Sequence, residues 1–351
     1  MAGYGSFNVD SLSAAISTYG EDVDKDSITQ LFRAGRPIDC VGDSVSWDEV
    51  EMHRHLAPIT GPDSPSSFQG QATKRVRSSA LAHIKVSKMI PGSSLFKERA
   101  PGIDGADPAS VLGYELEDLQ KMIGASIEYL CASALLGTIN VSNTTIPGST
   151  VSFSVAFQPN TYTAGTWSSA STKIASSEIV DLMKDHRAAS GMVPKIAITE
   201  PDVTGYIMQN TEAQTMLSNA FGAAFLQRSA FDPSLNDGGL QIGGLSFRTS
   251  DGVYVPEGGS PTRYWTQDRI ALLPALDKLG GVLGMAEGYG IVPDGPAFGG
   301  AGSLGLKRAP SRGYYAYTMP SGDPAGIKLV AGWVGLPILL FPSAVTVATV
   351  S

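Results

Sequence analysis

The stretch DPASVLGYELEDLQKMIGASIEYLCASALLGTI, residues 107–139, predicts one long amphipathic helix. Asp107 is suited to the N-cap, with Pro108 at the first helical position, and Gly137 is suited to end the helix. At 1.5 Å per residue, the roughly 29 residues that follow the N-cap in a helix over 107–136 would be roughly 43 Å long. Large apolar residues recur every three or four positions, so they form one stripe along one helix face. The stripe consists of Leu112, Leu116, Leu119, Ile123, Ile127, Leu130 and Ala134.

The segment before this helix is basic and extended. From Gln71 to Arg99 it holds seven basic residues and one acid, Glu98, so its net charge is 7 − 1 = +6. It has no helical apolar period, although Ala82–Met89 reads as a strand. An arm without a core of its own, joined to a rigid helix, indicates a subunit that lies on its neighbours. The basic residues are Lys74, Arg75, Arg77, Lys85, Lys88, Lys97 and Arg99.

The N-terminal segment carries the opposite charge. Residues 1–64 hold eleven acids and four basic residues, giving 4 − 11 = −7, within a chain of net charge −8. The acidic segment and the basic arm are therefore electrostatic complements, although most charge runs are simply solvated surface. The acidic balance of the whole chain argues against sequence-specific binding of DNA.

Composition favours a globular protein with many turns and short strands. The 351 residues include 40 glycines and 22 prolines, and they are enough for one elaborated domain or two. Two cysteines make no disulfide framework, and Cys131 is expected to be buried on the long helix. The first residues lack the pattern of a secretory signal. The uncharged run 329–350 contains Pro337 and Pro342, so we expect no membrane span there and three separate buried strands, at 329–333, 338–341 and 345–350.

Short elements are expected on both sides of the long helix. Residues 1–60 are predicted to be an irregular arm with a short helix at 27–34 and an extended stretch at 41–56. Removing 1–20 is expected to spare the fold. Thr211 and Gln214 form a capping-box pattern at the start of a helix. The predicted strands are 138–141, 149–157 and 195–199, of which the first two are expected to pair with the C-terminal strands. The predicted helices are 176–190, 201–209 and 211–226.

No convincing catalytic or metal-binding pattern is present. His53 and His55 would share one strand face with Glu49 and Glu51, but a solvated strand face explains this pattern better than a metal site does. No histidine follows His186, so the last 165 residues (351 − 186) contain no imidazole ligand. The GxGxxG match at 300–305 lies between segments that read as neither strand nor helix, so we interpret it as a loop and expect no cofactor.

Ser44 is the one candidate nucleophile. Gly42-Asp43-Ser44-Val45 resembles the nucleophile block of GDS-type hydrolases. Those enzymes need a histidine near the C-terminus, and this chain has none there, so Ser44 would lack its base. We therefore expect no catalytic residues, no metal and no enzymatic activity.

The order of parts, more than any one motif, resembles a known family. The matching pieces are LAPITG at 56–61, IEYLCASALLGTI at 127–139, the helix at 201–212 and PSGDP at 320–324. Together with the basic arm and the long helix, they resemble the major capsid proteins of tailed bacteriophages, specifically the lambda-type major head protein family. The resemblance covers most of residues 50–351.

This resemblance implies an α+β fold of the HK97-like type. By that layout, the long helix at 107–136 would be the spine of a peripheral P-domain, and an axial A-domain would follow. Inter-subunit contacts would be made by Lys74, Arg75, Arg77, Lys85 and Lys88 of the extended E-loop. The expected divisions are an N-terminal arm at 1–68, the E-loop at 69–105, the P-domain at 106–200, the A-domain at 201–325 and C-terminal strands returning to the P-domain at 326–351.

The function implied is that of a structural head protein. Such a protein assembles as hexamers and pentamers into an icosahedral shell around double-stranded DNA. Scaffolding and portal proteins are expected as partners, and the participation of a decoration protein is left open. It would assemble in the host cytoplasm and reside in the virion, away from membranes. The alternatives are an encapsulin-like nanocompartment shell, a serine hydrolase using Ser44, and a secreted adhesin, which the absent signal disfavours.

Overall fold

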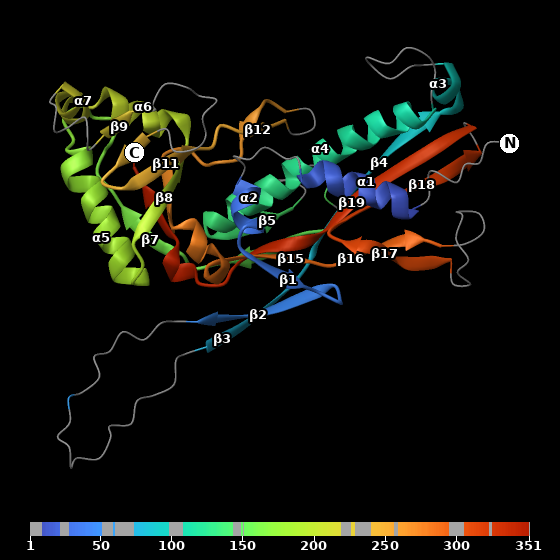
Figure 1. Ribbon diagram of the computed structural model, residues 1–351, viewed down its shortest axis with the longest axis horizontal. Coiled ribbons are helices and arrows are strands. Elements are labelled where there is room, and N and C mark those ends of the chain that lie inside the picture. The colour runs from blue at the N-terminus through green and yellow to red at the C-terminus, as the bar shows by residue number, and fades with distance from the viewer. Residues whose placement is uncertain are drawn as a thin grey trace.

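The computed structural model is elongated, with two main β-sheets and a hairpin that leaves the body from one side (Figure 1). A long helix lies along one of the sheets, and shorter helices surround the other. The structure describes residues 9–21, 28–50, 59, 74–97, 108–142, 149, 151–218, 226–228, 240–255, 259–294, 305–322 and 325–350.

The predicted long helix is confirmed as α4, Pro108–Leu135. All seven residues of its predicted apolar stripe are buried, as is Cys131. The helix ends where Gly137 adopts a φ of 104°, a left-handed conformation that favours glycine. The stripe packs on β19, Ala325–Leu339, and on β4, Ala82–Pro91. This layer of helix on sheet forms the larger core of the protein.

The sheet beneath α4 is built around β19. This strand pairs antiparallel with β4, β15 and β18, and β1 pairs in parallel with β15. Residues 329–339 are all buried, and the strand continues through Pro337, where we had expected separate pieces. A chain segment this apolar is stable only when it is covered on both faces. The other strands are β1 Arg36–Asp39, β15 Leu283–Glu287 and β18 Tyr314–Gly322.

The strand predicted at 82–89 is confirmed as β4, and it belongs to the five-stranded sheet. This strand pairs with β19 over ten residues, from Ala82 opposite Gly335 to Pro91 opposite Gly326. Its alternating Ala82, Ile84 and Ile90 supply the apolar face that the isolated segment seemed to lack. The partner strand lies more than 230 residues away in the sequence (326 − 91 = 235), so local patterns did not reveal the pairing.

Residues 9–21 form a helix, which corrects the expectation that this part of the N-terminal segment is irregular, and the short helix predicted at 27–34 is confirmed as α2, Ile28–Arg33. Helix α1, Val9–Glu21, lies along β18, and helix α2 packs on α4. The Ser13 hydroxyl accepts a hydrogen bond from the Ala316 N–H at 3.1 Å and lies 3.2 Å from the Ala316 carbonyl oxygen. Because the free groups of a strand edge attract other strands, α1 protects β18 from unwanted pairing.

The second main sheet has seven strands in the order β7-β20-β14-β8-β11-β10-β9. The expected pairing of the C-terminal strands with 138–141 and 149–157 is wrong. Strand β20 pairs with β7 and β14, while β5 and β6 form a small sheet of their own. Helix α5 ends at Ser190, as predicted, and Gly191 follows it with a φ of 74°. The strands are β7 Asn160–Thr163, β20 Thr346–Thr349, β14 Arg269–Pro274, β8 Pro194–Thr199, β11 Leu245–Thr249, β10 Leu240–Ile242, β9 Leu226–Arg228, β5 Thr138–Val141 and β6 Phe153–Ala156.

Helices around the second sheet largely follow the prediction. The capping-box expectation is wrong, because α7 is capped by Asn210, whose Oδ1 accepts from the Glu212 N–H at 3.0 Å. The remaining helical elements are α3 Gly92–Lys97, a π-helical turn at Ile174–Glu178, α5 Ile179–Ser190, α6 Pro201–Gln209, α7 Thr211–Ser218, and 3₁₀ turns at Leu276–Gly281 and Pro342–Ala344.

Three hairpins complete the described fold. The hairpin of β2 and β3 leaves the body, the hairpin of β12 and β13 lies near α4, and that of β16 and β17 lies beside β18 (Figure 1). No helix of the described part of the chain could cross a membrane. The GxGxxG match at 300–305 lies outside the described residues except for Gly305. The strands are β2 Ser44–Val50, β3 Lys74–Ala80, β12 Val253–Tyr254, β13 Thr262–Arg263, β16 Tyr289–Pro293 and β17 Leu306–Arg312.

Candidate inter-subunit surface

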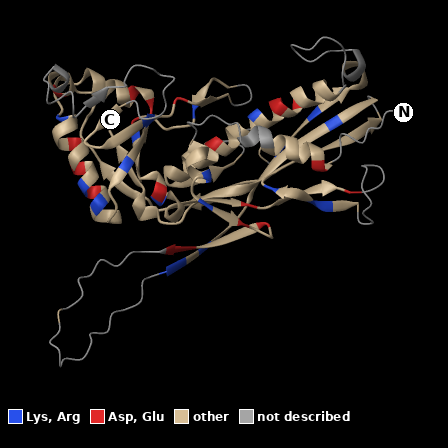
Figure 2. Cartoon of the chain, viewed as in Figure 1, with Lys and Arg blue, Asp and Glu red and all other residues tan. Residues whose placement is uncertain are grey.

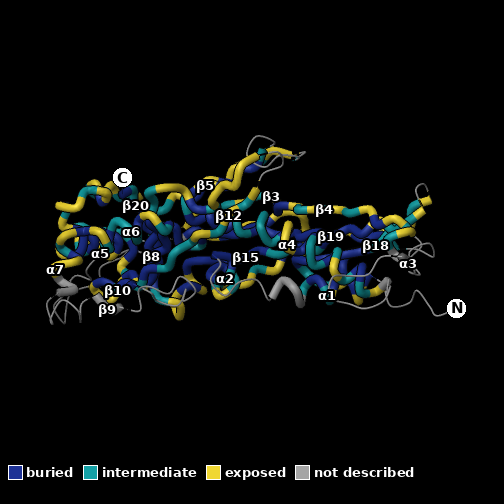
Figure 3. Tube along the Cα trace, turned by 90° about the horizontal axis from the view of Figure 1, so that it is seen from above, coloured by how far each residue is buried: buried dark blue, intermediate teal, exposed yellow. Residues whose placement is uncertain are grey.

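The β2–β3 hairpin leaves the body of the protein (Figure 1). Its two strands pair antiparallel from Ser44 opposite Ala80 to Val50 opposite Lys74. Figure 3 shows the hairpin standing away from the long body. The strands carry opposite charges, with Asp48 and Glu49 on β2 and Lys74, Arg75 and Arg77 on β3 (Figure 2).

The base of the hairpin is fixed to the body by a tryptophan. Trp47 is 5% exposed and its ring centroid lies 6.2 Å from that of Phe157, which follows β6. Beside it, the Arg77 Nε donates to Glu49 Oε2 at 2.9 Å, and Arg77 Nη1 donates to the Ala156 carbonyl oxygen at 3.4 Å. Glu49 is itself buried, so this ion pair is partly shielded from water. These contacts fix the direction in which the hairpin leaves the body.

Lys85 and Lys88 lie away from the hairpin, on β4. Lys88 forms ion pairs with Glu115 and with Asp118, at 3.2 Å, on α4. The hydrogen bond to Glu115 is the main reason that the pKa of Lys88 is raised. The Lys85 ammonium lies 5.5 Å from the centroid of the Tyr317 ring on β18. The structure therefore brings Lys74, Arg75 and Arg77 together but separates them from Lys85 and Lys88.

The charge complementarity expected between segments is partly satisfied inside the chain. Glu49 pairs with Arg77, and Asp39 pairs with Arg312 of β17. Asp10 of α1 lies 3.8 Å from Lys307, also on β17. Acids of the N-terminal segment thus meet basic residues of their own subunit. Contacts of the five predicted basic residues with a neighbouring subunit stay a prediction.

Sequence reasoning missed the contacts that anchor the hairpin. The alternation of Val45, Trp47 and Glu49, all buried, is the signal of a half-buried strand. A tryptophan in such a pattern indicates a packing contact of the hairpin base. Its partner Phe157 lies more than 100 residues further along (157 − 47 = 110), so only the fold could identify it.

The structure describes only some of the residues considered for catalysis or metal binding. Ser44 is exposed on β2 opposite Ala80, and His83 Nε2 lies 3.9 Å from Asp43 Oδ1. Among the described residues, no group of three or more His, Cys, Asp or Glu side chains could hold a metal ion. His53 and His55 lie outside the residues that the structure describes.

Comparison with solved structures identifies the fold. A prophage capsid protein of Escherichia coli CFT073 superposes with a TM-score of 0.63 at 15% identity, covering 98% of this chain and 99% of that one. The mature capsid of bacteriophage PhiM1 gives a TM-score of 0.49 at 9% identity, covering 91% and 86%. The encapsulin of Synechococcus elongatus PCC 7942 gives 0.47 at 11% identity, covering 93% and 88%. The fold is the HK97-like capsid fold, as the resemblance implied.

Sequence comparison identifies the family. No curated protein matches the chain. The family model described as phage major capsid protein E matches residues 32–350, which is nearly the whole chain and includes both sheets, the hairpin and α4. The chain therefore belongs to the phage major capsid protein E family.

Proposed function

We propose that this capsid protein forms the icosahedral head of a tailed phage, assembling as hexamers and pentamers around double-stranded DNA. The observation that carries the proposal is the charged β2–β3 hairpin, which is anchored at its base and leaves the body. Within the described chain its two strands pair only with each other, so both outer edges are open to a neighbouring subunit. If the hairpin of one subunit binds a different surface of the next subunit, repeating this contact produces a closed ring when the rotation between neighbouring subunits adds up to a full turn.

The division of the chain into capsid domains follows from the strand pairing. We infer that the β2–β3 hairpin is the E-loop, and that β4 belongs with α4 and the five-stranded sheet in the P-domain. The seven-stranded sheet would form the A-domain, which then includes β7 and β8 from before residue 201 and β20 from the C-terminus. The boundaries expected from the sequence would shift accordingly.

An acidic subunit suits a container for DNA. The chain carries a net charge of −8, so an interior lined by it would repel the DNA backbone and leave the genome free to enter and leave. Assembly in the host cytoplasm with scaffolding and portal proteins would complete the head, and the subunit would act without enzymatic activity. The nanocompartment alternative shares the fold, but the family match favours the phage head.

Charge reversal on the hairpin tests the proposal. Lys74→Glu and Arg75→Glu together should leave a folded subunit that assembles poorly, because both residues lie on the projecting strand β3. Each exposed pair contributes under about 1 kcal/mol, but the loss is repeated at every subunit. Negative-stain micrographs of the full chain, expressed with its scaffold, would count closed shells.

The matched control reverses two exposed lysines elsewhere. Lys121 and Lys184 have side chains 68% and 72% exposed, and each pairs with an acid on its own helix. Lys121→Glu and Lys184→Glu together should assemble as the wild type does. Normal shells from the hairpin variant would rule out the electrostatic role of the hairpin. Only monomers from the wild-type chain under all salt and pH conditions would refute the shell itself.

A further inference from the structure

The hairpin of β12 and β13 crosses from the seven-stranded sheet to the long helix α4. It forms most of the connection between β11 and β14, two strands of that sheet, and its described residues are 251–255 and 259–268, here called the strap. Tyr254 of the strap meets Tyr129 of α4 edge to face, with ring centroids 5.7 Å apart. The strap therefore joins the seven-stranded sheet to the helix that covers the five-stranded one (Figure 1).

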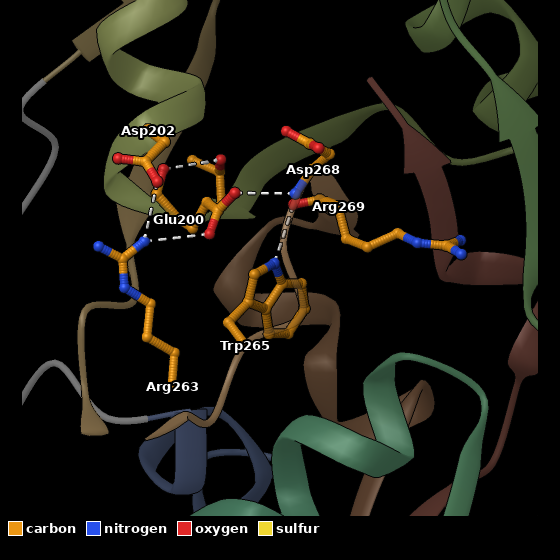
Figure 4. A network of polar contacts seen from close by, with 7 residues as sticks. Glu200, Asp202, Arg263, Trp265, Asp268 and Arg269 are labelled. Atoms are coloured by element: carbon orange, nitrogen blue, oxygen red, sulfur yellow. Dashed lines mark hydrogen bonds and ion pairs between the residues drawn. The ribbon is translucent and has the colours of Figure 1, made fainter. Parts of the chain in front are cut away.

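The root of the strap is clamped by a buried carboxylate. Glu200, at the end of β8, is 1% exposed. Its Oε1 accepts from the Asp268 N–H at 2.8 Å, and its Oε2 accepts from Arg263 Nη1 at 3.1 Å (Figure 4). Asp202 also accepts from Arg263 Nη1, at 3.2 Å. Since a buried carboxylate is costly unless both oxygens are paired, its location is tied to the presence of the strap.

Glu200 lies at the N-cap position of α6, but its side chain does not cap the helix. It is the N-cap residue of α6, where a side chain commonly accepts a hydrogen bond from the first helical turn. Its side chain makes no such bond and is directed to the strap instead. The local structure of α6 therefore does not account for this carboxylate.

The backbone at the end of the strap is strained. Asp268 has a φ of 55°, the one described residue other than glycine in this left-handed region. Its N–H is bound by Glu200, and its carbonyl oxygen accepts from the Val350 N–H at 2.9 Å. Next to it, Trp265 is buried and donates to the Arg269 carbonyl oxygen at 2.8 Å. Strain of this kind persists only where the surroundings hold it.

The clamp continues through aromatic rings to α4. Tyr254 stacks on Tyr264 with ring centroids 5.3 Å apart, and Tyr254 then meets Tyr129. Gly252 lies directly under the Tyr264 ring, where an added Cβ would come within 2.9 Å of it. The strap thus has a rigid path from the buried Glu200 to the surface of α4.

We propose that the strap, clamped by Glu200, holds the seven-stranded sheet at a fixed orientation to α4 and thereby sets the curvature of the shell. The second clause rests on the proposed function, since the angle between parts of a subunit is repeated at every position of a shell. Loosening the clamp should widen the range of angles, so that subunits close into shells of more than one size.

Hydrogen exchange of the full chain tests the clamp on the unassembled subunit. Arg263→Gln removes the cation from the buried carboxylate, and we expect the Tyr264 amide, which bonds the Gly252 carbonyl oxygen at 3.1 Å, to exchange about tenfold faster. Lys184→Gln is the control, because it breaks an exposed ion pair with Asp181 on α5 and should leave this amide unchanged. Arg263→Lys keeps the positive charge, so its Tyr264 amide should exchange at a rate between those of Arg263→Gln and Lys184→Gln.

Shell diameters measured by electron microscopy test the curvature. Arg263→Gln shells are expected to spread over more than one diameter, and Lys184→Gln shells to keep the wild-type diameter. Tyr254→Ala removes the ring that contacts Tyr129 of α4 and should spread the shell diameters similarly. The double variant Arg263→Gln with Tyr254→Ala should spread them little further, because both substitutions act on the same connection to α4.

The outcomes separate the two claims. Unchanged exchange in Arg263→Gln would overturn the clamp, and faster exchange with unchanged shell diameters would overturn its link to curvature. If the wild-type chain forms no shells, the proposed function fails, and the exchange of the Tyr264 amide still decides the clamp. A variant that does not fold, as judged by circular dichroism, is replaced in both tests by Arg263→Lys.

Discussion

His186 makes the stability of this subunit depend on pH below neutrality. It lies on α5 and is fully buried against the seven-stranded sheet. Its Nδ1 lies 2.9 Å from the Thr346 hydroxyl of β20, and its Nε2 is buried without a hydrogen-bond partner in the described chain. Burial lowers the pKa of His186 to about 4, although neighbouring Asp185 acts to raise it. The side chain is therefore neutral in the folded subunit at pH 7.

The size of this pH effect follows from the difference between the pKa of His186 in the folded chain and in the unfolded chain. The pKa falls from an ordinary 6.5 to about 4 on folding. Between these values the unfolded chain binds a proton that the folded chain excludes, so the free energy of unfolding decreases as pH falls from 6.5 and levels off below 4. Each pKa unit corresponds to about 1.36 kcal/mol, so 2.5 units give a loss of about 3 kcal/mol.

Denaturant unfolding of unassembled subunits at a series of pH values measures this loss. Carboxylates titrate in the same range, among them Glu287, whose pKa is raised by burial. The quantity to follow is therefore the free energy of unfolding of the wild type minus that of the variant at each pH. His186→Gln should remove about 3 kcal/mol of the pH dependence of the free energy of unfolding. His83→Gln, at a side chain that is 46% exposed, is the control substitution. Equal slopes for wild type and His186→Gln would refute the reasoning.

Three substitutions test other parts of the fold by thermal or denaturant unfolding. Ser13→Ala removes the hydroxyl that bonds the Ala316 backbone at the edge of β18, and should cost about 1–3 kcal/mol and promote aggregation. Glu128→Gln replaces the carboxylate that accepts hydrogen bonds from the Ile28 and Thr29 N–H groups, at the start of α2, with a neutral amide. This should lower the free energy of unfolding by about 1–2 kcal/mol. Gly332→Ala places a Cβ 2.7 Å from the Ile84 carbonyl oxygen and should cost about 1–3 kcal/mol.

Each of these substitutions has a control in a similar setting. Ser17→Ala removes an exposed hydroxyl of α1, and Glu117→Gln removes one partner of an exposed ion pair on α4, so both should change stability by less than about 1 kcal/mol. Gly322→Ala meets nothing within 4 Å on β18 and should be tolerated. A control as destabilised as its partner would contradict the corresponding assignment.

Elements with strong local periodicity could be predicted from the sequence. The apolar stripe of α4 lies wholly in the core, and the Pro108 and Gly137 signals mark its ends. Helices α5 and α6 and strand β8 are also confirmed. In each case the deciding contacts are between residues three or four apart or alternate along a strand, so a short window of sequence contains the information.

Features that depend on distant partners could not be predicted. The sequence predicts strand β4 but not its place in the core, because its partner β19 lies at the other end of the chain. The N-terminal residues were judged dispensable, yet α1 buries Leu12 and Ile16 and covers the edge of β18. Deleting residues 1–20 should therefore expose that edge and destabilise the subunit.

The candidate surface was predicted only in part. The basic character of Lys74, Arg75 and Arg77 is evident from composition, and these residues do lie together on β3. The partners of Arg77 and Lys88 are acids that a charge count cannot pair, because Glu115 belongs to another element and Glu49 to the other strand of the hairpin. The clamp at Glu200 left no sequence pattern, since its contacts join β8 to residues more than 60 positions away (263 − 200 = 63).

The most direct test of the central claim is a cryo-electron microscopy reconstruction of the particle that the full chain forms with its scaffold. We predict a closed icosahedral shell of hexamers and pentamers in which each β2–β3 hairpin lies on an adjacent subunit. A particle without closed symmetry, or a shell in which the hairpin contacts only its own subunit, would contradict the account.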